Sequence, residues 1–124
     1  MLKGSKTPFT GMVINGKDRE FYKNGKPDGK WLNFYENGKL KSIENWKNGV
    51  LSGKHIIYSN DEIKVVEYNY NNGEESGPYL LNHDNGKPYI IGEFHNGSPS
   101  GIWRYYDKNG KLTGENDFSK KKKK

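Results

Sequence analysis

Short apolar and aromatic segments alternate along this chain with polar segments that contain Asn-Gly. A glycine interrupts the sequence about every dozen residues, and Asn, Gly, Tyr and β-branched residues dominate, so no segment favours a helix. Asn-Gly between two apolar segments is the strongest short-range signal for a β-hairpin. The pattern therefore predicts an all-β chain of short strands and tight turns.

One six-residue motif, N-G-x-x-x-G, organises the chain. It occurs four times at a spacing of 24 residues, at 24–29, 48–53, 72–77 and 96–101. A fixed period in the range of about 20–50 residues is the signature of a repeat architecture. The motif therefore predicts an array of units in which each unit buries surface mainly against its neighbours.

A second Asn-Gly lies between successive copies of the motif, at 37–38, 85–86 and 109–110, while one unit holds Asp61-Glu62 at the equivalent place. Asn tolerates a positive φ and Gly has no Cβ to clash, so Asn-Gly favours a type I′ turn. Each unit is predicted to contain two strands and two turns. Because Asp61-Glu62 departs from the pattern, a Val at Glu62 is expected to cost less than a Val at Gly49 or Gly97.

The predicted fold is all-β: an elongated antiparallel β-hairpin repeat array, a single meandering sheet with a 24-residue period. The first unit is shorter than the others, as is typical of a cap. The predicted segments are a leading segment at 1–10, a repeat domain at 11–118 and a lysine tail at 119–124. The repeat domain divides into a capping unit at 11–28 and units at 29–52, 53–76, 77–100 and 101–118.

Two aromatic columns emerge when the units are aligned. The first lies mostly two residues before an Asn-Gly and consists of Tyr22, Trp46, Tyr70, Phe94 and Phe118. The second lies two residues after the last glycine of the motif and consists of Trp31, His55, Tyr79 and Trp103. Equivalent side chains are expected to stack along the array, as ladders do in solenoid proteins.

Residues 29–53, which begin with Gly29-Lys30-Trp31 and end on the second copy of the motif, resemble the MORN-repeat variant family, and residues 101–112 match nearly as well. The resemblance extends over residues 11–118 and is weakest in the unit at 53–76. Bacterial proteins built in this way are often labelled antitoxins of toxin–antitoxin systems, and MORN repeats more widely are associated with membrane recognition and protein scaffolding. The resemblance implies no catalytic residues.

Composition supports a repeat array. Apolar residues make up 31% of the chain, below the usual share of about 45–50% in globular proteins. Aromatic residues reach 14% and are expected to supply most of the buried area, which argues against disorder. There is no Cys, so the chain has neither disulfides nor a thiolate metal site.

Targeting signals are absent from the sequence as it stands. Its N-terminus lacks the apolar region of a signal peptide, and no apolar run approaches the roughly 18 residues of a membrane span. The chain is therefore expected to be cytoplasmic, or secreted or surface-exposed if a signal has been removed.

Candidate catalytic chemistry is sparse. His55 stands in an aromatic column and is expected to pack there, while His83 and His95 adjoin turns of different classes and are expected at opposite edges of the sheet. The acidic pairs Asp61-Glu62 and Glu74-Glu75 fall in turns, where solvation is the natural state. We therefore predict no enzymatic activity, no cofactor and no metal site.

The net charge of +6 comes almost wholly from a terminal lysine run, and without those five lysines it would be +1. The run could make weak contact with an anionic membrane or another polyanion; the alternative is a solubilising end, and no specific nucleic acid is predicted. The lysines are Lys120, Lys121, Lys122, Lys123 and Lys124.

The predicted function is a non-enzymatic, protein-binding repeat module, possibly of the antitoxin or immunity type that neutralises a protein partner. The alternative is a module for membrane-surface or scaffold attachment through the sheet and the basic tail. Recognition requires residues that differ between units, and Tyr is enriched in binding hot spots. The predicted partner-binding residues are Tyr35, Tyr68, Tyr89 and Tyr105; alternatively, they merely cover the sheet.

Overall fold

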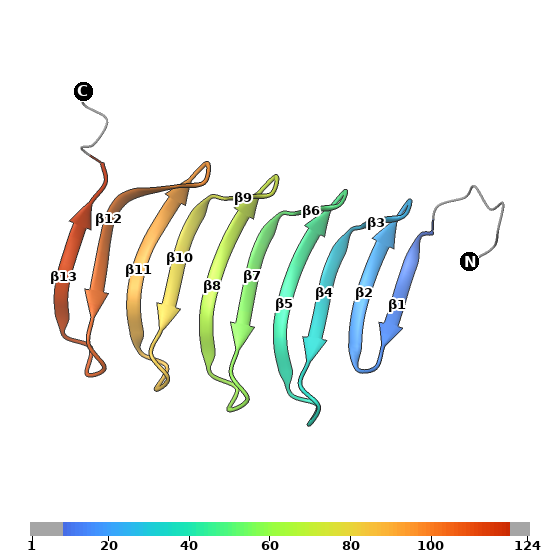
Figure 1. Ribbon diagram of the computed structural model, residues 1–124, viewed down its shortest axis with the longest axis horizontal. Helices are drawn as coiled ribbons and strands as arrows, with labels where there is room; N and C mark the ends of the chain where they lie inside the picture. Colours follow the sequence, from blue (N-terminus) through green and yellow to red (C-terminus); the bar gives the residue numbers. More distant parts are fainter. Residues whose placement is uncertain (1–8, 120–124) are drawn as a thin grey trace.

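The computed structural model describes residues 9–119, which form one open antiparallel sheet drawn out along a single axis (Figure 1). Ten main strands follow one another in chain order across the sheet, and three two-residue strands, β3, β6 and β9, pair with β2, β5 and β8. No helix occurs in this part of the chain, so the predicted all-β hairpin array is confirmed. The strands are β1 (Gly11–Asn15), β2 (Asp18–Lys23), β3 (Lys26–Pro27), β4 (Gly29–Phe34), β5 (Leu40–Lys47), β6 (Val50–Leu51), β7 (Gly53–Tyr58), β8 (Lys64–Asn71), β9 (Glu74–Glu75), β10 (Gly77–Asn82), β11 (Pro88–His95), β12 (Ser98–Tyr106) and β13 (Leu112–Asp117).

The N-G-x-x-x-G motifs form the tight turns at one edge of the sheet. The Asn and the first Gly of all four copies have positive φ, for example 50° at Asn48 and 89° at Gly49. Positive φ at both central residues defines the type I′ turn, so this prediction is confirmed. The amide of Gly49 also donates to the carbonyl oxygen of Pro27 in the preceding unit at 2.8 Å, and the other three copies repeat this bond. Each turn therefore also links its unit to the one before.

The loops at the opposite edge have a different shape. In the loop at 35–39, the Gly38 amide donates to the Tyr35 carbonyl oxygen at 2.9 Å and the Tyr35 amide donates to the Lys39 carbonyl oxygen at 2.8 Å. Gly38 has a φ of 91°, whereas Asn37 is not at positive φ. This is the three-residue hairpin loop, a type I turn followed by one left-handed residue. The type I′ prediction was therefore wrong here, because a three-residue loop needs a positive φ only at its last position.

The loop at 59–63 keeps this shape although it lacks Asn-Gly. Glu62 takes the place of the glycine with a φ of 67°, and its amide donates to the Ser59 carbonyl oxygen at 2.9 Å. The Ser59 hydroxyl accepts two further amides, those of Asp61 and Ile63. The expectation that a Val at Glu62 is mild is therefore wrong, because a β-branched residue is as unsuited to this backbone as to that of Gly49.

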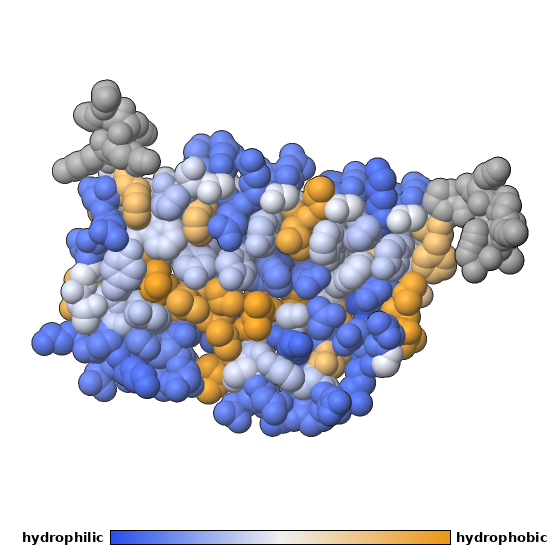
Figure 2. Space-filling view, viewed as in Figure 1, coloured by the Kyte–Doolittle hydropathy of each residue, from blue (hydrophilic) through white to orange (hydrophobic). Residues whose placement is uncertain are grey.

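The sheet is a single layer, and successive residues of each strand point to its opposite faces. Among residues 9–119, only Val66, Trp103 and Ser42 are buried, at 5%, 8% and 7% exposure. On the face that Figure 2 shows, apolar residues gather across the middle and hydrophilic residues line both turn edges. Stability must therefore come from contacts between neighbouring units rather than from a core between two layers.

One face, the aromatic face, carries both predicted aromatic columns, whose rings lie with centroids 5.1–6.2 Å from their neighbours. The indole N–H groups of Trp31 and Trp103 are satisfied by the carbonyl oxygens of Phe21 and Glu93, at 2.8 and 3.1 Å. The prediction that equivalent rings stack on one another holds among the described residues only for Tyr79 and Trp103, and the other contacts within the columns join a ring of one column to a ring of the other. The rings fall into a first group, Phe9, Tyr22, Trp31 and Trp46, and a second group, His55, Tyr68, Tyr70, Tyr79, Phe94, Trp103 and Phe118.

The other face, the aliphatic face, carries one central row of side chains across the strands. At its middle, Glu67 accepts hydrogen bonds from the ammonium groups of Lys54 and Lys64 at 2.7 and 2.8 Å. These two bonds hold the pKa of the Glu67 carboxyl below its usual value, against the opposing effect of its burial. The aliphatic members of the row, placed by strand register, are Leu32, Ile43, Ile56, Leu80 and Ile91.

Candidate functional site

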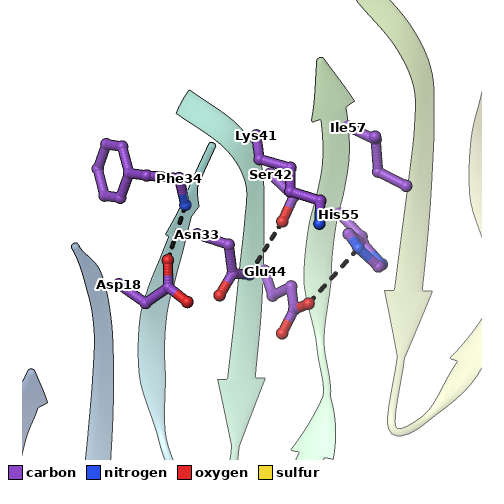
Figure 3. A pocket seen from close by; sticks show the side chains of 8 residues that line it. All are labelled: Asp18, Asn33, Phe34, Lys41, Ser42, Glu44, His55 and Ile57. Atoms are coloured by element: carbon purple, nitrogen blue, oxygen red, sulfur yellow. Dashed lines mark hydrogen bonds and ion pairs between the residues drawn. The ribbon is translucent and has the colours of Figure 1, made fainter. Parts of the chain in front are cut away.

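The aromatic face is interrupted where its two groups of rings meet. Within residues 9–119, no ring contact joins Trp46 of the first group to His55 of the second. A hollow of about 300 Å³ lies beside this gap (Figure 3). We call it the polar hollow; it is lined by Asp18, Asn33, Phe34, Lys41, Ser42, Glu44, His55 and Ile57.

Four neighbouring main strands build the polar hollow. Asp18 begins β2, Asn33 lies near the end of β4, and β5 contributes Ser42 and Glu44. Asn33 pairs with Ser42 in register, and its amide nitrogen donates to the Ser42 hydroxyl at 2.9 Å. Strand pairing therefore fixes these side chains on one face, as Figure 3 shows.

Each carboxylate of the hollow is held by one scaffold donor. Asp18 Oδ1 accepts the backbone amide of Phe34 at 2.8 Å. Glu44 Oε1 accepts the indole N–H of Trp46 at 2.9 Å, and Glu44 Oε2 lies 3.8 Å from His55 Nε2. The second oxygen of each carboxylate faces no lysine or arginine within ion-pair distance in the described part of the chain.

His55 closes the hollow on the side of the second ring group. Its ring lies 5.6 Å from Tyr68 and 6.2 Å from Tyr70, so the packing role predicted for it is confirmed. Its Nδ1 atom is buried and has no hydrogen-bond partner among residues 9–119. An unpaired buried nitrogen costs free energy that a bound group could recover.

The repeat shows that the fold does not require polar residues here. The position of Asn33 is taken by Ile57 and Leu81 in later units, and the position of Ser42 is taken by Val66 and Ile90. Those apolar side chains occupy equivalent places in the same sheet. Burying polar groups costs free energy unless each one is paired, so apolar residues would suit this face better. The polar hollow is therefore a departure from the repeat that stability alone does not explain.

The hollow offers acceptors rather than a reactive constellation. The Ser42 hydroxyl is engaged by Asn33 rather than by His55, so no nucleophile–base pair forms. Nowhere in residues 9–119 do three His, Asp or Glu side chains gather in a way that could hold a metal ion. What remains is a set of carboxylate and amide oxygens beside tryptophan rings, which is suited to binding.

Comparison with known proteins adds a family likeness. Residues 27–48 and 99–120 match the family model described as MORN repeat variant. These two segments, under half of the chain, are similar to MORN repeat variants. Curated proteins and solved structures gave no match. The family that this model describes is one of non-catalytic binding and repeat modules.

Two of the predicted partner-binding tyrosines lie at the loop edge of the sheet. The Tyr35 hydroxyl donates to the Tyr58 carbonyl oxygen of the next unit at 2.7 Å, and the ammonium of Lys41 lies 5.7 Å from the centre of the Tyr35 ring. Tyr89 is 42% exposed and stacks on His83 at 4.5 Å. His83 is the 48-residue equivalent of Tyr35 and contacts the Tyr106 carbonyl oxygen in the same way, at 2.8 Å. The loops at 35–39 and 83–87 thus each contact a backbone carbonyl oxygen of the next unit through their first side chain.

The other two predicted tyrosines lie on the aromatic face. Tyr68 is part of the second ring group, 5.5 Å from Tyr79, whose pKa is raised by burial and then by Tyr68. Tyr105 pairs with Ile90 and its hydroxyl accepts a hydrogen bond from the side chain of Asn116 at 2.8 Å. The four tyrosines therefore do not converge on one site, and their role in binding a partner stays a prediction. The tail lysines 120–124 lie outside the described residues.

The polar hollow was missed from the sequence although a signal was present. Asn33 and Ser42 are strand residues whose counterparts in the next two units are apolar, and Asp18 is the counterpart of Ser42 in the first unit. The predicted binding residues came from aromatic positions alone, and the loss of apolar residues at 33 and 42 is the signal that points to the hollow. No helix in the described residues is long and apolar enough to cross a membrane.

Proposed function

We propose that this chain is a non-enzymatic module that binds a protein partner on its aromatic face, with the polar hollow as the specific contact. One observation carries the proposal: polar residues interrupt a repeated aromatic face at a single place where the repeat itself favours apolar ones. An identical ladder cannot fix the register of a partner, whereas a unique interruption can. Tryptophan and tyrosine beside such a contact are the residue types that dominate binding hot spots.

The form of the molecule suits this role. An uncovered sheet face supplies a rigid surface, so little side-chain and backbone ordering opposes association. The half-buried rings of Trp31 and Trp46 are already fixed by hydrogen bonds to Phe21 and Glu44. A partner segment that covers the hollow and both rings would bury aromatic area around a polar centre, the usual anatomy of a protein interface.

The finer form of the proposal is that the partner is a toxin and that this chain acts as an antitoxin or immunity-type protein. The likeness to MORN repeat variants supports it, because bacterial proteins of that kind often carry the antitoxin label. Neutralisation would then follow because the bound chain covers the surface on which the partner's activity depends. The alternative, attachment to a membrane surface or scaffold, draws on the lysines at 120–124.

Capture of a partner from a lysate of the source cells tests the proposal through matched variants. Glu44→Arg fills the hollow with a bulky side chain, while Glu36→Arg makes the same charge change at an exposed loop position of the same hairpin. Capture should be lost with Glu44→Arg and kept with Glu36→Arg, provided that both variants melt like the wild type. Equal capture by both would refute the proposed site. Co-sedimentation with anionic vesicles that depends on residues 120–124, without any captured protein, would favour the membrane alternative.

A further inference from the structure

We propose that the polar hollow receives an arginine side chain of the protein partner, an inference that rests on the proposed function. Asp18 and Glu44 place two carboxylates in one hollow, and neither has a lysine or arginine within ion-pair distance among residues 9–119. The one lysine that lines the hollow, Lys41, has its ammonium over the Tyr35 ring at 5.7 Å. Apart from His55, which lies 3.8 Å from Glu44, the hollow therefore presents negative charge without a counter-ion among the described residues, and a cation from outside would supply one.

The free acceptors are spread rather than concentrated. Asp18 Oδ2, Asn33 Oδ1 and Glu44 Oε2 come from β2, β4 and β5, and no hydrogen-bond donor of the described residues holds them. Neighbouring strands lie about 4.8 Å apart, so these oxygens span a broad, flat site. A guanidinium offers five donors in a planar fork and can reach several such acceptors, whereas an ammonium is a point charge.

Two tryptophan rings next to Glu44, outside the lining of the hollow, favour the same occupant. Trp31 lies opposite Glu44 in register, and Trp46 donates to the Glu44 carboxylate from two residues along the strand. Both rings belong to the first group and lie 5.5 Å apart. Guanidinium groups stack on indole faces and bind carboxylates in the same site more readily than ammonium groups do. The charge, the spacing of the acceptors and the neighbouring indole rings thus all select arginine.

Titration of the full chain with Nα-acetyl-arginine amide, followed by NMR at the indole N–H of Trp46, tests this assignment. The arginine amide should give a saturable shift with a Kd on the order of 1–10 mM. The neutral analogue Nα-acetyl-citrulline amide should bind at least about tenfold more weakly, because it lacks the charge that strengthens these hydrogen bonds. Added NaCl should weaken the binding of the arginine amide and leave the binding of the citrulline amide unchanged.

Conservative variants complete the test. Glu44→Gln and Asp18→Asn each remove one charge and keep an oxygen that can accept from Trp46 and Phe34, respectively. Each variant should therefore lower the affinity for the arginine amide about tenfold. Glu36→Gln, at an exposed loop position, should leave its affinity unchanged. Equal shifts with citrulline, no saturable shift with arginine, or full affinity in both hollow variants would overturn the assignment. If that happens while Glu44→Arg still abolishes partner capture, the proposed function stands and only the arginine is wrong.

Discussion

Gly92→Ala should destabilise the sheet because Gly92 leaves room for the most buried aromatic side chain. A Cβ at Gly92 would lie 2.7 Å from Trp103 Cε3 and closer still to Cδ2 and Cε2 of the same ring. Real Cβ atoms do not approach carbon atoms so closely, so the indole must move. Trp103 packs against Tyr79 and Phe94 at 5.4 and 5.1 Å and has only 8% exposure, so it has little room to do so.

The magnitude follows from two bounds. Overpacking of a well-filled site typically costs about 1–3 kcal/mol. Complete loss of a packed Trp costs about 3–5 kcal/mol, which limits the effect of expelling the indole. Gly92 is not at positive φ, so the alanine itself would recover up to about 1 kcal/mol through the unfolded state. We expect a net cost of about 2 kcal/mol, which corresponds to a fall in Tm on the order of 10 °C for a chain of this size.

Gly114→Ala is the matched control. Gly114 lies in β13, is also not at positive φ, and a Cβ there would meet only Tyr105 Cδ2, at an ordinary 3.9 Å. Thermal unfolding followed by circular dichroism should therefore show the control melting at or slightly above the wild-type temperature and Gly92→Ala well below it. If both variants melt together, the indole of Trp103 does not occupy the space above Gly92 and the packing argument is wrong.

Three further outcomes are expected from the fold. Glu62→Gly should stabilise the chain by up to about 1 kcal/mol in chemical denaturation, because glycine relieves the left-handed strain at a φ of 67°; a loss of stability would show that this loop is not strained. Tyr35→Phe should cost about 1 kcal/mol by removing the bond to the Tyr58 carbonyl oxygen, and an unchanged melting curve would mean that this bond does not form in solution. The pKa of Glu67 is lowered in the folded chain. The contribution of its ionised carboxylate to stability should therefore be complete above the pKa of the unfolded chain, near 4.5, and be lost as pH falls through the lower pKa of the folded chain. Glu67→Gln should flatten this acid dependence of Tm, and a profile that matches the wild type would exclude Glu67 as its source.

The sequence predicted the repeat, the hairpins and the aromatic columns because each follows from local chemistry. Asn-Gly at 24-residue spacing determines where the chain turns, and aromatic residues at the same spacing lie on the same face of the sheet. The loops at the second edge were predicted less well, because Asn-Gly fits both a two-residue and a three-residue loop. The register in which the flanking strands pair sets the loop length, and the loop length decides between the two.

The candidate site depends on features that single positions do not reveal. Asp18, Asn33 and Glu44 meet because three strands pair in a particular register, and each residue alone looks like an ordinary polar position on a half-exposed strand. The tyrosines were chosen because they break the repeat, and that criterion equally describes Asn33 and Ser42. A polar residue at a position that is apolar in the other units is therefore as informative as an aromatic residue that does not recur.

The three tryptophans allow the most direct test of partner binding at the polar hollow. Trp31 and Trp46 flank the hollow, whereas Trp103 lies on β12, several strands away in the second ring group. NMR spectra of the indole N–H groups, recorded as the captured partner is added, should show large changes at Trp46 and Trp31 and little change at Trp103. Binding that shifts the Trp103 resonance and leaves that of Trp46 in place would contradict the account.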